Sequence, residues 1–562
     1  MSKASNIWLK NYPKGVPATI DPLAAGTLTD MIADGFRRFA NKPAFESFGK
    51  RLTYAEVDLS GQAVTSWLQA QGLKKGDRVA IMMPNVMAYP VVMFAILRGG
   101  FTVVNVNPLY TARELEHQLN DSGAKALFVL ENFAHVVEEA RSGLKTVEKI
   151  VVATAGDLLG FKGVIINFVA RKIKKVVKSF SLSGSQTLKS VLAAHAGQMP
   201  KPAVITPDDV AFLQYTGGTT GISKGATLLH RNITANVLQA DAWITPFIDP
   251  SKGDTVMVTA LPLYHIFALT CCCIYIQRIG GCALLIANPR DIPGFIKTLK
   301  SSRFTMISGV NTLYNALLNA PGIEEVDFSN LQFAVAGGMA MQGPVAQRWQ
   351  KQTGKPIIEG YGLSEKSPIA TMNLLTIKDF SGTIGMPAPS TELRIADDKG
   401  QEVAPGTPGE IWIKGPQVMA GYWNRPDETA KAITKDGWFK SGDVGIMLAD
   451  GQFKIVDRIK DMVLVSGFNV YPSEIEEIIS SHPGVMEVAV IGLPDDHSGE
   501  AVAAYVVKKD PALTEEAIIT HCRESLTAYK RPKTVVFRET LPKTPVGKVL
   551  KRVLRDEVIG KP

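Results

Sequence analysis

Short apolar runs alternate with amphipathic stretches from the start of the chain to about residue 450. Runs such as AKALFVL and LQFAVAGG have the length and the nearly continuous apolar character of strands buried on both faces. Between such runs lie stretches with helical spacing of apolar positions, for example residues 112–121. This alternation predicts an α/β architecture with largely parallel sheets. Other runs with the same strand-like character are DRVAIMMPN, EKIVVATA, AFLQY, DTVMVTALP and RFTMISGV.

The pattern changes after about Gly382, where shorter β segments are separated by glycine and proline turns. The segments ELRIADDKGQEV, GEIWIKGP and GQFKIVDR predict a compact β subdomain appended to the larger sheets. Further on, a new unit has predicted helices at 473–481 and 515–526 and the predicted strands EVAVIGLP and EAVAAYVVKK. We therefore predict two domains, residues 1–459 and 460–562.

Length and composition describe a globular protein with more than one core. The chain has 562 residues, of which 46% are hydrophobic and 20% are charged, so it can bury a large interior. Its five cysteines include no Cys-x-x-Cys pair and have no histidine-rich surroundings that would make a zinc site. This cysteine usage favours a reducing compartment.

Two segments bear on a possible membrane location. The N-terminus lacks the apolar segment of a secretory signal. The uncharged run at 255–277 approaches the length of a membrane-spanning helix. Pro262, Tyr264 and His265 interrupt this run midway, so we predict a buried strand, a loop and a buried helix there.

Most of the formal net charge of +8 comes from residues 158–182, a segment with six Lys or Arg residues and no acid. Wound as a helix, residues 162–178 would place apolar and basic side chains on opposite sides. One interpretation is a helix that docks on an anionic membrane, which would make the protein cytoplasmic and peripherally associated with the inner membrane. The other is a helix packed on the protein core with a solvated basic face. A nucleic-acid site is not expected, because no aromatic residues are interleaved with the basic ones.

The stretch with the most unusual composition is YTGGTTGISKG, residues 215–225. Glycines let backbone NH groups approach a ligand closely, hydroxyls add donors, and Lys224 supplies a positive charge, so the composition suits a polyphosphate. It is not a Walker-type P-loop, because Lys224 follows Ser223 instead of a glycine and precedes Gly225 instead of a hydroxyl residue. A flexible surface turn is the alternative.

Four further clusters carry candidate chemistry, and each has a structural alternative. IIEGYGLSEKSP combines an aromatic ring, a hydroxyl and a carboxylate, which suit a base, a phosphate and Mg²⁺, or form a satisfied turn. GWFKSGDVG places Asp443 where it would accept both hydroxyls of a ribose or form an Asx-turn. DRIKDMVLVSGFNVYP is either functional or a solvated charged linker. PKTPVGKVLKR presents Lys548, for which an exposed, solvated lysine is the alternative.

Taken together and in this order, these segments resemble the AMP-forming acyl-CoA synthetases of the adenylate-forming superfamily, which also includes luciferases and peptide-synthetase adenylation domains. The resemblance spans nearly the whole chain. LQYTGGTTG, GATLLHRN, NVNPLYTARELEHQL and LPLYHIFAL look most similar to bacterial long-chain fatty acid CoA ligases. The likeness implies a large N-terminal domain of two α/β sheets plus a β subdomain, with a small mobile α+β C-terminal domain.

The resemblance also implies a reaction. ATP and a fatty acid would form acyl-AMP and pyrophosphate, and the acyl group would then pass to CoA, with Mg²⁺ as cofactor. Lys548 would bridge the carboxylate and the α-phosphate, Glu365 would bind Mg²⁺, and Lys224 would contact the outer phosphates; these three are the expected catalytic residues. Lys460 would be the hinge of the C-terminal domain.

Further site residues follow from the same resemblance. The other residues expected to bind ATP are Thr216, Gly217, Gly218, Thr219, Thr220, Gly221, Gly338, Tyr361, Gly362, Ser364, Asp443 and Arg458. Those expected to approach CoA after the domain turns are Ser466, Gly467 and Phe468. Those expected at the acyl pocket are His265 and Gly337, with Gly337 also beside the adenine.

Two positions depart from the family pattern. Lys366 stands where relatives commonly carry a small or apolar residue, and it would either point to solvent or assist with phosphate. Gly217 stands where many relatives have serine, as in the fatty-acid branch. The alternative functions are a ligase for a medium-chain or aryl acid and a non-catalytic lipid-binding protein; Lys224, Glu365 and Lys548 together argue against the second. A homodimer is compatible with the sequence.

Overall fold

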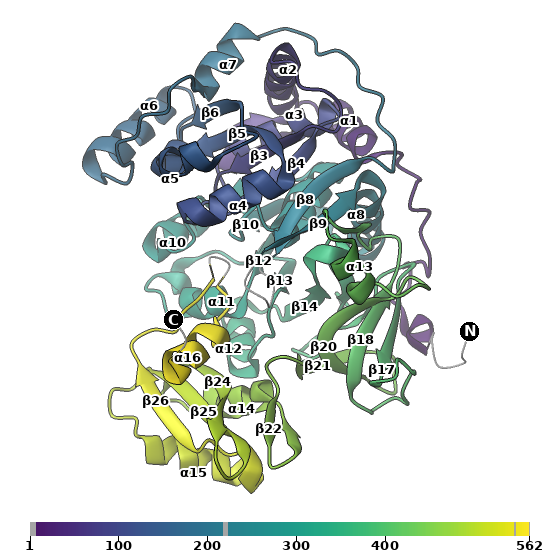
Figure 1. Cartoon of the computed structure of the whole chain (residues 1–562), viewed down its shortest axis with the longest axis vertical. Helices are drawn as coiled ribbons and strands as arrows, with labels where there is room; N and C mark the ends of the chain where they lie inside the picture. Colours follow the sequence, from purple (N-terminus) through teal and green to yellow (C-terminus); the bar gives the residue numbers. More distant parts are fainter. Residues whose placement is uncertain (1–6, 217–222, 545–546, 561–562) are drawn as a thin grey trace.

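The computed structural model describes residues 7–216, 223–544 and 547–560. Two large, mostly parallel sheets with flanking helices make up most of the chain, and an antiparallel sheet and a smaller C-terminal unit lie beside them (Figure 1). The predicted fold class is therefore confirmed: an α/β protein with a β subdomain and a small α+β C-terminal domain. The exact boundary at 459/460 stays a prediction.

The first large sheet has eight strands and carries the segment on either side of the glycine-rich loop. Its strands from β8 to β7 run parallel, and they have the nearly continuous apolar sequences of strands buried on both faces. Residues 217–222, which lie outside the described residues, separate β8 from β9, and these two strands pair antiparallel. In sheet order the strands are β19 (Gly421–Tyr422), β9 (Lys224–Leu229), β8 (Val210–Thr216), β4 (Thr102–Asn105), β3 (Arg78–Met82), β5 (Ala124–Leu130), β6 (Lys149–Ala153) and β7 (Gln186–Thr187).

The second large sheet has nine strands, and its β14 and β15 carry the region around Tyr361. Six of its strands, from β14 through β1, are parallel, while β15, β16 and β2 pair antiparallel at the two ends. In sheet order the strands are β16 (Met386–Pro387), β15 (Ile369–Met372), β14 (Ile357–Gly362), β13 (Phe333–Ala336), β12 (Met306–Gly309), β10 (Val256–Thr259), β11 (Cys282–Leu285), β1 (Pro43–Ser47) and β2 (Lys50–Thr53).

The region after the large sheets is antiparallel, as its glycine and proline turns predict. The β subdomain contains β17 (Glu392–Ala396), β18 (Gly409–Lys414), β20 (Phe439–Met447) and β21 (Phe453–Arg458). The C-terminal unit has its own apolar cores. Its sheet contains β23 (Phe468–Val470), β22 (Val463–Val465), β25 (Gly499–Lys508), β24 (Val485–Asp495) and β26 (Thr534–Arg538).

Local signals in the sequence fix several helix ends. Helix α4 (Ala112–Ser122) begins with a capping box between Thr111 and Glu114 and ends at Gly123 with φ +64°, a conformation that favours glycine. The remaining helices around the large sheets are α1 (Leu28–Arg38), α2 (Tyr54–Ala70), α3 (Ala88–Arg98), α5 (Ala134–Ala140), α7 (Leu188–Ala194), α8 (His230–Ile244), α10 (Ile292–Lys300), α11 (Asn311–Leu318), α12 (Gly343–Thr353) and α13 (Pro426–Ala432). The C-terminal unit adds α14 (Pro472–Ser480), α15 (Glu515–Ser525) and α16 (Lys551–Ile559).

The uncharged run at 255–277 folds as predicted into a buried strand, a loop and a buried helix. The helix is wound as a π-helical segment, η7 (Ala268–Ile274), before it continues as α9 (Tyr275–Arg278). Within the described residues, no helix is both long and apolar enough to cross a bilayer.

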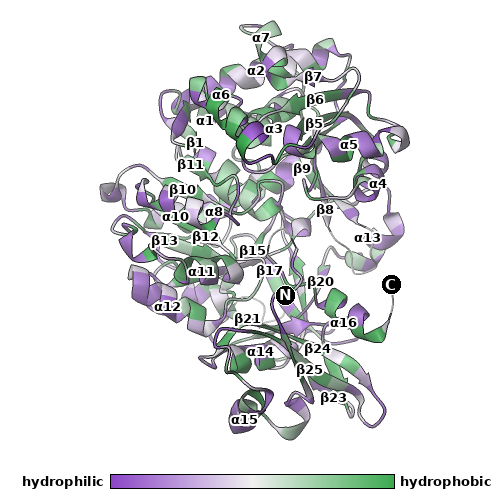
Figure 2. Cartoon of the chain, turned by 90° about the vertical axis from the view of Figure 1, so that its left-hand side faces the viewer, coloured by the Kyte–Doolittle hydropathy of each residue, from purple (hydrophilic) through white to green (hydrophobic). Residues whose placement is uncertain are grey.

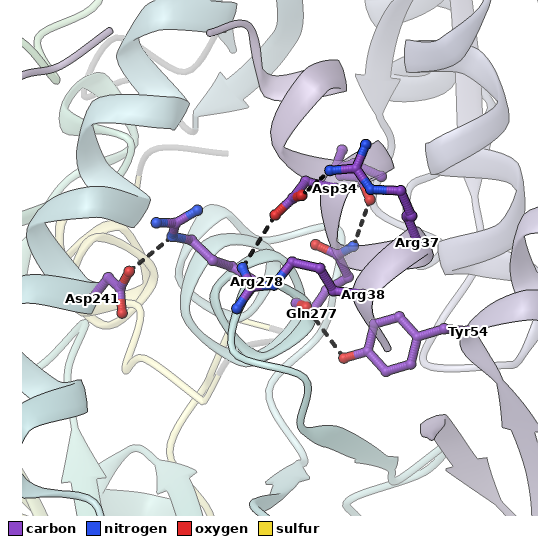
Figure 3. Close-up of polar contacts among 8 residues, drawn as sticks. Asp34, Arg37, Arg38, Tyr54, Asp241, Gln277 and Arg278 are labelled. Atoms are coloured by element: carbon purple, nitrogen blue, oxygen red, sulfur yellow. Dashed lines mark hydrogen bonds and ion pairs between the residues drawn. The ribbon is translucent and has the colours of Figure 1, made fainter. Parts of the chain in front are cut away.

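Polar contacts attach α9 to its neighbours (Figure 3). The Gln277 side chain donates to the Ile32 carbonyl of α1 (2.8 Å), and Arg278 donates to Asp241 of α8 (2.8 Å). A Cβ at Gly35 of α1 would lie 2.2 Å from the Gln277 amide nitrogen, so glycine permits this close approach. These contacts fix the helix that follows His265.

The predicted helix over 162–178 is shorter than expected. Helix α6 (Phe161–Phe168) continues only as the π-helical turn η4 (Val169–Ile173), so Lys175 and Lys178 lie beyond the helix. Ile166 packs against the large apolar core, whereas other apolar residues of the segment face solvent: Phe161, for example, is 81% exposed. The choice between membrane docking and packing on the core stays a prediction.

We expect Gly385→Ala to lower the free energy of unfolding by about 3 kcal/mol or more, because left-handed strain adds to overpacking. Gly385 has φ +78°, and a Cβ there would lie 2.0 Å from the Met372 carbonyl oxygen at the end of β15. Gly406→Ala is the matched control, since Gly406 has φ +84° but nothing within 4 Å of its Cβ position, and should cost about 1 kcal/mol. Urea unfolding followed by fluorescence measures both; equal losses would contradict the prediction.

Candidate active site

A buried carboxylate joins the second large sheet to the β subdomain. Asp443 of β20 is 3% exposed. Its Oδ2 accepts a hydrogen bond from the Tyr361 hydroxyl of β14 (2.6 Å), and its Oδ1 lies 3.0 Å from Nε of Arg458, its register partner on β21. Burial, and then the nearby Asp443 charge, raise the pKa of Tyr361 well above its usual range, so its hydroxyl stays protonated and donates.

Lys548 of the C-terminal unit reaches this cluster. The nearest heavy atom to a Cβ built on Gly338 is Cε of Lys548, at 3.7 Å. Burial, followed by the positive charge of Arg458, lowers the pKa of Lys548 to about 8, against the opposing effect of the Asp443 and Glu365 carboxylates. Lys548 is half-buried, so the alternative of an exposed, solvated lysine is wrong.

Gly547, directly before Lys548, lies close to α11. The Thr312 hydroxyl donates to the Gly547 carbonyl (3.4 Å), and the Lys548 NH donates to the Thr544 hydroxyl (3.0 Å). Gly547 has φ +85°, and a Cβ there would lie 2.6 Å from the Thr312 hydroxyl oxygen. Glycine is thus required both by conformation and by space.

Glu365 and Lys224, expected at the phosphates, both contact a segment that sequence reasoning missed. Glu365 is buried, and its Oε1 accepts a hydrogen bond from the Tyr422 hydroxyl of β19 (2.8 Å). Lys224, the first residue of β9, forms an ion pair with Glu428 of α13, and its Nζ lies 5.5 Å from the Tyr422 ring centroid. The antiparallel pairing of β19 with β9 brings these groups together, and a two-residue strand has no sequence signature that would have predicted it.

Lys366 is fully buried, so the interpretation that it points to solvent is wrong. Its Nζ lies 3.0 Å from the ring centroid of Phe439 on β20, and burial lowers its pKa well below the usual range. Ser364, Glu365 and Lys366 form one 3-10 turn in which Ser364 is half-buried and the other two are buried. Phe439 is a further residue that the sequence did not single out.

His265 and Gly337, expected at the acyl pocket, both lie beside Phe267. The Phe267 NH donates to Nδ1 of His265 (3.4 Å), and a Cβ on Gly337 would lie 3.1 Å from Cε1 of Phe267. Burial, and then the positive charge of Lys548, lower the pKa of His265 to about 3. The imidazole is therefore neutral near neutral pH, and Lys548 and His265 are close enough to affect each other.

Other expected residues are placed as follows. Gly362 lies at the end of β14, where a Cβ would be 2.1 Å from the Pro368 carbonyl oxygen. Thr216 ends β8 and is the register partner of Lys224. Lys460 lies in the turn directly after β21. Gly217, Gly218, Thr219, Thr220 and Gly221 lie outside the described residues.

The structure does not bring the turn Ser466–Phe468, which was expected at CoA, to this cluster. The Ser466 NH donates to the Ser498 carbonyl (2.7 Å), and the Phe468 ring stacks on Tyr529 at 4.8 Å, both within the C-terminal unit. All three residues of the turn are exposed.

Comparisons with known proteins agree with this arrangement. The model of the AMP-binding enzyme family matches residues 32–423, and that of the AMP-binding enzyme C-terminal domain matches residues 474–548. The chain is 52% identical over 561 residues to a long-chain-fatty-acid–CoA ligase of Escherichia coli O6:H1, covering 99% of both chains, and 37% identical to one of Bacillus subtilis, covering 98% of both.

Solved structures share the fold over nearly the whole chain. A crystal structure of an anthranilate CoA ligase in complex with anthranoyl-AMP has a TM-score of 0.84 and 25% identity, covering 97% of this chain and 98% of that one. A Mycobacterium tuberculosis fatty acyl CoA synthetase has a TM-score of 0.69 and 28% identity, covering 96% and 99%. With both large regions matched by the family's models and relatives similar over the full length, the chain belongs to the AMP-binding enzyme family.

Proposed function

We propose that this protein is a long-chain fatty acid–CoA ligase that forms acyl-AMP from ATP and a fatty acid and then transfers the acyl group to CoA. The observation that carries the proposal is the position of Lys548, which reaches from the C-terminal unit to Gly338 and the Asp443 cluster. The names of the relatives that match over the full length support the choice of acid.

Activation is needed because a free carboxylate is a poor electrophile whose leaving group would be oxide. In the first step, a carboxylate oxygen attacks the α-phosphorus of ATP, and the bond to pyrophosphate breaks. In the second, the CoA thiolate attacks the acyl carbonyl, and AMP leaves with the electron pair of the broken bond. The protein's part in both steps is positioning and charge neutralisation.

Lys548 and Lys224 would neutralise charge during the first step. Lys548 would lie between the fatty acid carboxylate and the α-phosphate, and Lys224 would contact the outer phosphates. Each oxygen of Asp443 has an acceptor site left beyond its bond to Tyr361 or Arg458, so Asp443 would still accept the ribose hydroxyls. Tyr361 would flank the base.

Glu365 fits the requirements of a Mg²⁺ ligand in such a site. Among the described residues, no group of three or more His, Cys, Asp or Glu side chains could hold a metal ion. A lone carboxylate is nevertheless typical for Mg²⁺, which takes one or two protein carboxylates plus substrate phosphates. Bound there, the ion would offset the charge of the phosphates.

The acyl chain would need an apolar pocket with a neutral wall. His265 meets this requirement, since its low pKa keeps it uncharged, and Phe267 contacts it and lies beside Gly337. These features favour a shaping role for His265 over general-base catalysis.

Transfer to CoA would require a second arrangement of the C-terminal domain. The turn Ser466–Phe468 is exposed, whereas Lys548 lies at the cluster, so one arrangement does not serve both steps. Rotation about Lys460, which lies in the turn after β21, would exchange them.

We further propose that the protein takes its substrate from an anionic membrane through a docking patch on α6 and η4. Six apolar side chains of α6, η4 and the residues directly after them are at least half exposed: Phe161, Val164, Ile165, Phe168, Ile173 and Val176. The helix lies at the edge of the molecule (Figure 1) and is largely apolar in its hydropathy colouring (Figure 2).

Basic residues beside the docking patch supply the charge complementarity. Lys172, Lys175 and Lys178 are exposed. Arg171 contributes less positive charge to this surface, because it forms an ion pair with Glu131 (2.7 Å). Exposed apolar residues flanked by cations are typical of a helix lying in an anionic lipid interface.

The proposed acid class is tested by AMP formation with Mg²⁺, ATP and CoA across fatty acids of increasing length and a set of aryl acids. We expect kcat/KM to rise about fourfold per methylene until the pocket is filled, since each buried methylene contributes about 0.8 kcal/mol. Lys548→Ala is the control, and should lose adenylation while retaining transfer from preformed acyl-AMP. Highest kcat/KM with an aryl acid would contradict the choice of acid, and no AMP with any acid would overturn the ligase function.

The proposed charge of Lys548 predicts a pH profile. Its pKa of about 8 means that the cation is present below this pH and lost above it. We therefore expect kcat/KM of the first half-reaction, followed by pyrophosphate release without CoA, to fall as pH rises through about 8. Lys548→Arg should be slower but should lack this fall, because guanidinium stays charged. The same fall in both proteins would contradict the role of Lys548.

Docking is tested by sedimentation with phosphatidylglycerol-containing vesicles. We expect Phe161→Ser/Val164→Ser/Phe168→Ser to weaken binding by at least about tenfold, because apolar burial is lost. The control Leu59→Ser/Met199→Ser/Val204→Ser changes three exposed apolar residues elsewhere and should bind normally.

The charge contribution is tested by Lys172→Gln/Lys175→Gln/Lys178→Gln. At about 1 kcal/mol for each lysine near the surface, this variant should lose affinity for the anionic vesicles and not for vesicles of phosphatidylcholine alone. Unchanged binding of both the apolar and the basic variants would remove the docking proposal.

A further inference from the structure

One short segment, β19 with α13, contacts both charged residues expected at the outer phosphates of ATP. Tyr422 of β19 donates to Glu365, and Glu428 of α13 pairs with Lys224. The Lys224 and Glu428 side chains are 21% and 25% exposed, so this ion pair is better shielded from water than a typical surface pair.

Several contacts hold α13 in place against β9. β19 is antiparallel to β9, with Tyr422 opposite Ala226. The Thr429 hydroxyl of α13 accepts from the Tyr422 NH (2.9 Å), and a Cβ on Gly421 would lie 2.8 Å from Cγ2 of Thr429. The helix is thereby attached to the strand beside Lys224, and Glu428 is presented by fixed backbone.

The carboxylate of Glu428 lies between two lysines. One oxygen pairs with Lys224, and the other lies 2.7 Å from Nζ of Lys431, which is 72% exposed. The hydrogen bond from Lys224, followed by that from Lys431, lowers the pKa of Glu428 to about 2. Glu428 is therefore an anion at any working pH.

A carboxylate already on Lys224 and an arriving phosphate compete for the same cation. One ammonium group has three donors, but two negative charges at contact distance repel, so each anion weakens the binding of the other. Displacement of Glu428 from Lys224 would not leave the carboxylate unpaired, because Lys431 stays within reach on the same helix. Exchange of partners is thus less costly than breaking a buried pair outright.

We propose that Glu428 is a resting-state counter-ion of Lys224 that competes with the phosphates of ATP and pyrophosphate and weakens their binding. The proposal rests on the proposed function, since it takes Lys224 as a phosphate-binding residue. Glu428 would keep Lys224 ordered before ATP binds and would recapture it after the first step, which speeds the departure of pyrophosphate. Glu428 acts through Lys224, so it is a positioning residue.

If Glu428 supported phosphate binding instead of competing with it, the affinity of the Glu428→Gln variant for pyrophosphate would change in the opposite direction. If Glu428 only supported the productive position of Lys224, its removal would weaken phosphate binding. If it competes with phosphate, its removal strengthens binding, and the gain requires Lys224. The sign of the change therefore separates the two roles.

The test uses titration calorimetry of the full-length protein with magnesium pyrophosphate as the probe. We expect Glu428→Gln to bind pyrophosphate about three- to tenfold more tightly than the wild type and to release it more slowly after the first step. Asp427→Asn, which makes the same change in net charge one residue away, should stay within about twofold of the wild type. In a Lys224→Gln background, Glu428→Gln should cause no further gain, because the competing pair no longer exists.

Several outcomes would overturn the proposal: weaker or unchanged pyrophosphate binding by Glu428→Gln, an equal gain by Asp427→Asn, or a gain that persists without Lys224. Thermal unfolding checks that each variant is folded, and the charge-conserving Glu428→Asp variant should restore part of the competition. Acid-dependent AMP formation by the wild type is measured alongside. Its failure would overturn the proposed function, whereas normal AMP formation with no tightening in Glu428→Gln would overturn only the role of Glu428.

Discussion

The hydrogen-bonded carboxylate of Asp443 is the contact on which the candidate site depends. A buried carboxylate is costly unless its oxygens are satisfied, and here one oxygen is bound by Tyr361 of the second large sheet and the other by Arg458 of the β subdomain. Three separate strands are therefore held at one point. Arg458 is also the last residue of β21, so this contact fixes the place from which the chain leaves for the C-terminal unit.

The charges around this contact are arranged for an anion. Lys548 and Arg458 lie near each other, and the repulsion between them, added to burial, lowers the pKa of Lys548. Lys366 is also buried, and burial lowers its pKa well below the usual range. Binding of a polyphosphate would offset the repulsion between Lys548 and Arg458, and by linkage it would raise the pKa of Lys548 again. Glu428 acts on Lys224 in a similar way, because its carboxylate pairs with that cation.

Much of the fold could be predicted because many of its strands and turns are determined by residues close together in the sequence. Continuous apolar runs predicted the parallel strands β3, β5, β6, β10, β12 and β13, and glycine and proline turns predicted the antiparallel subdomain. The helix at 162–178 was predicted too long, because spacing alone does not show where α6 changes to a π-helical turn and ends. Burial of Lys366 was missed because a charged residue is normally solvated, and the ring that accepts it, Phe439, is 73 residues away in sequence.

The candidate site likewise contains residues that the sequence predicted and residues that it did not. Tyr361, Asp443, Arg458 and Lys548 belong to motifs with recognisable sequences, and the structure brings them together. Tyr422 and Glu428 have no such signature, since they reach Glu365 and Lys224 only through the pairing of a two-residue strand with β9. Contacts of this kind depend on tertiary structure, so the spacing of apolar and polar residues along the chain does not predict them.

The contacts that place Lys548 are well suited to being made and broken. Thr312 reaches the Gly547 carbonyl at 3.4 Å, and Asn315 reaches the Met486 carbonyl at 3.2 Å, both at the long end of the range for hydrogen bonds. The groups involved are neutral and polar, so water replaces each partner at little cost when the units separate. The apolar cores of the C-terminal unit consist of its own residues, and therefore stay buried during such a movement. A site that needs Lys548 for one step and the turn Ser466–Phe468 for the next requires an interface of this kind, since a large apolar interface would hold the first arrangement permanently.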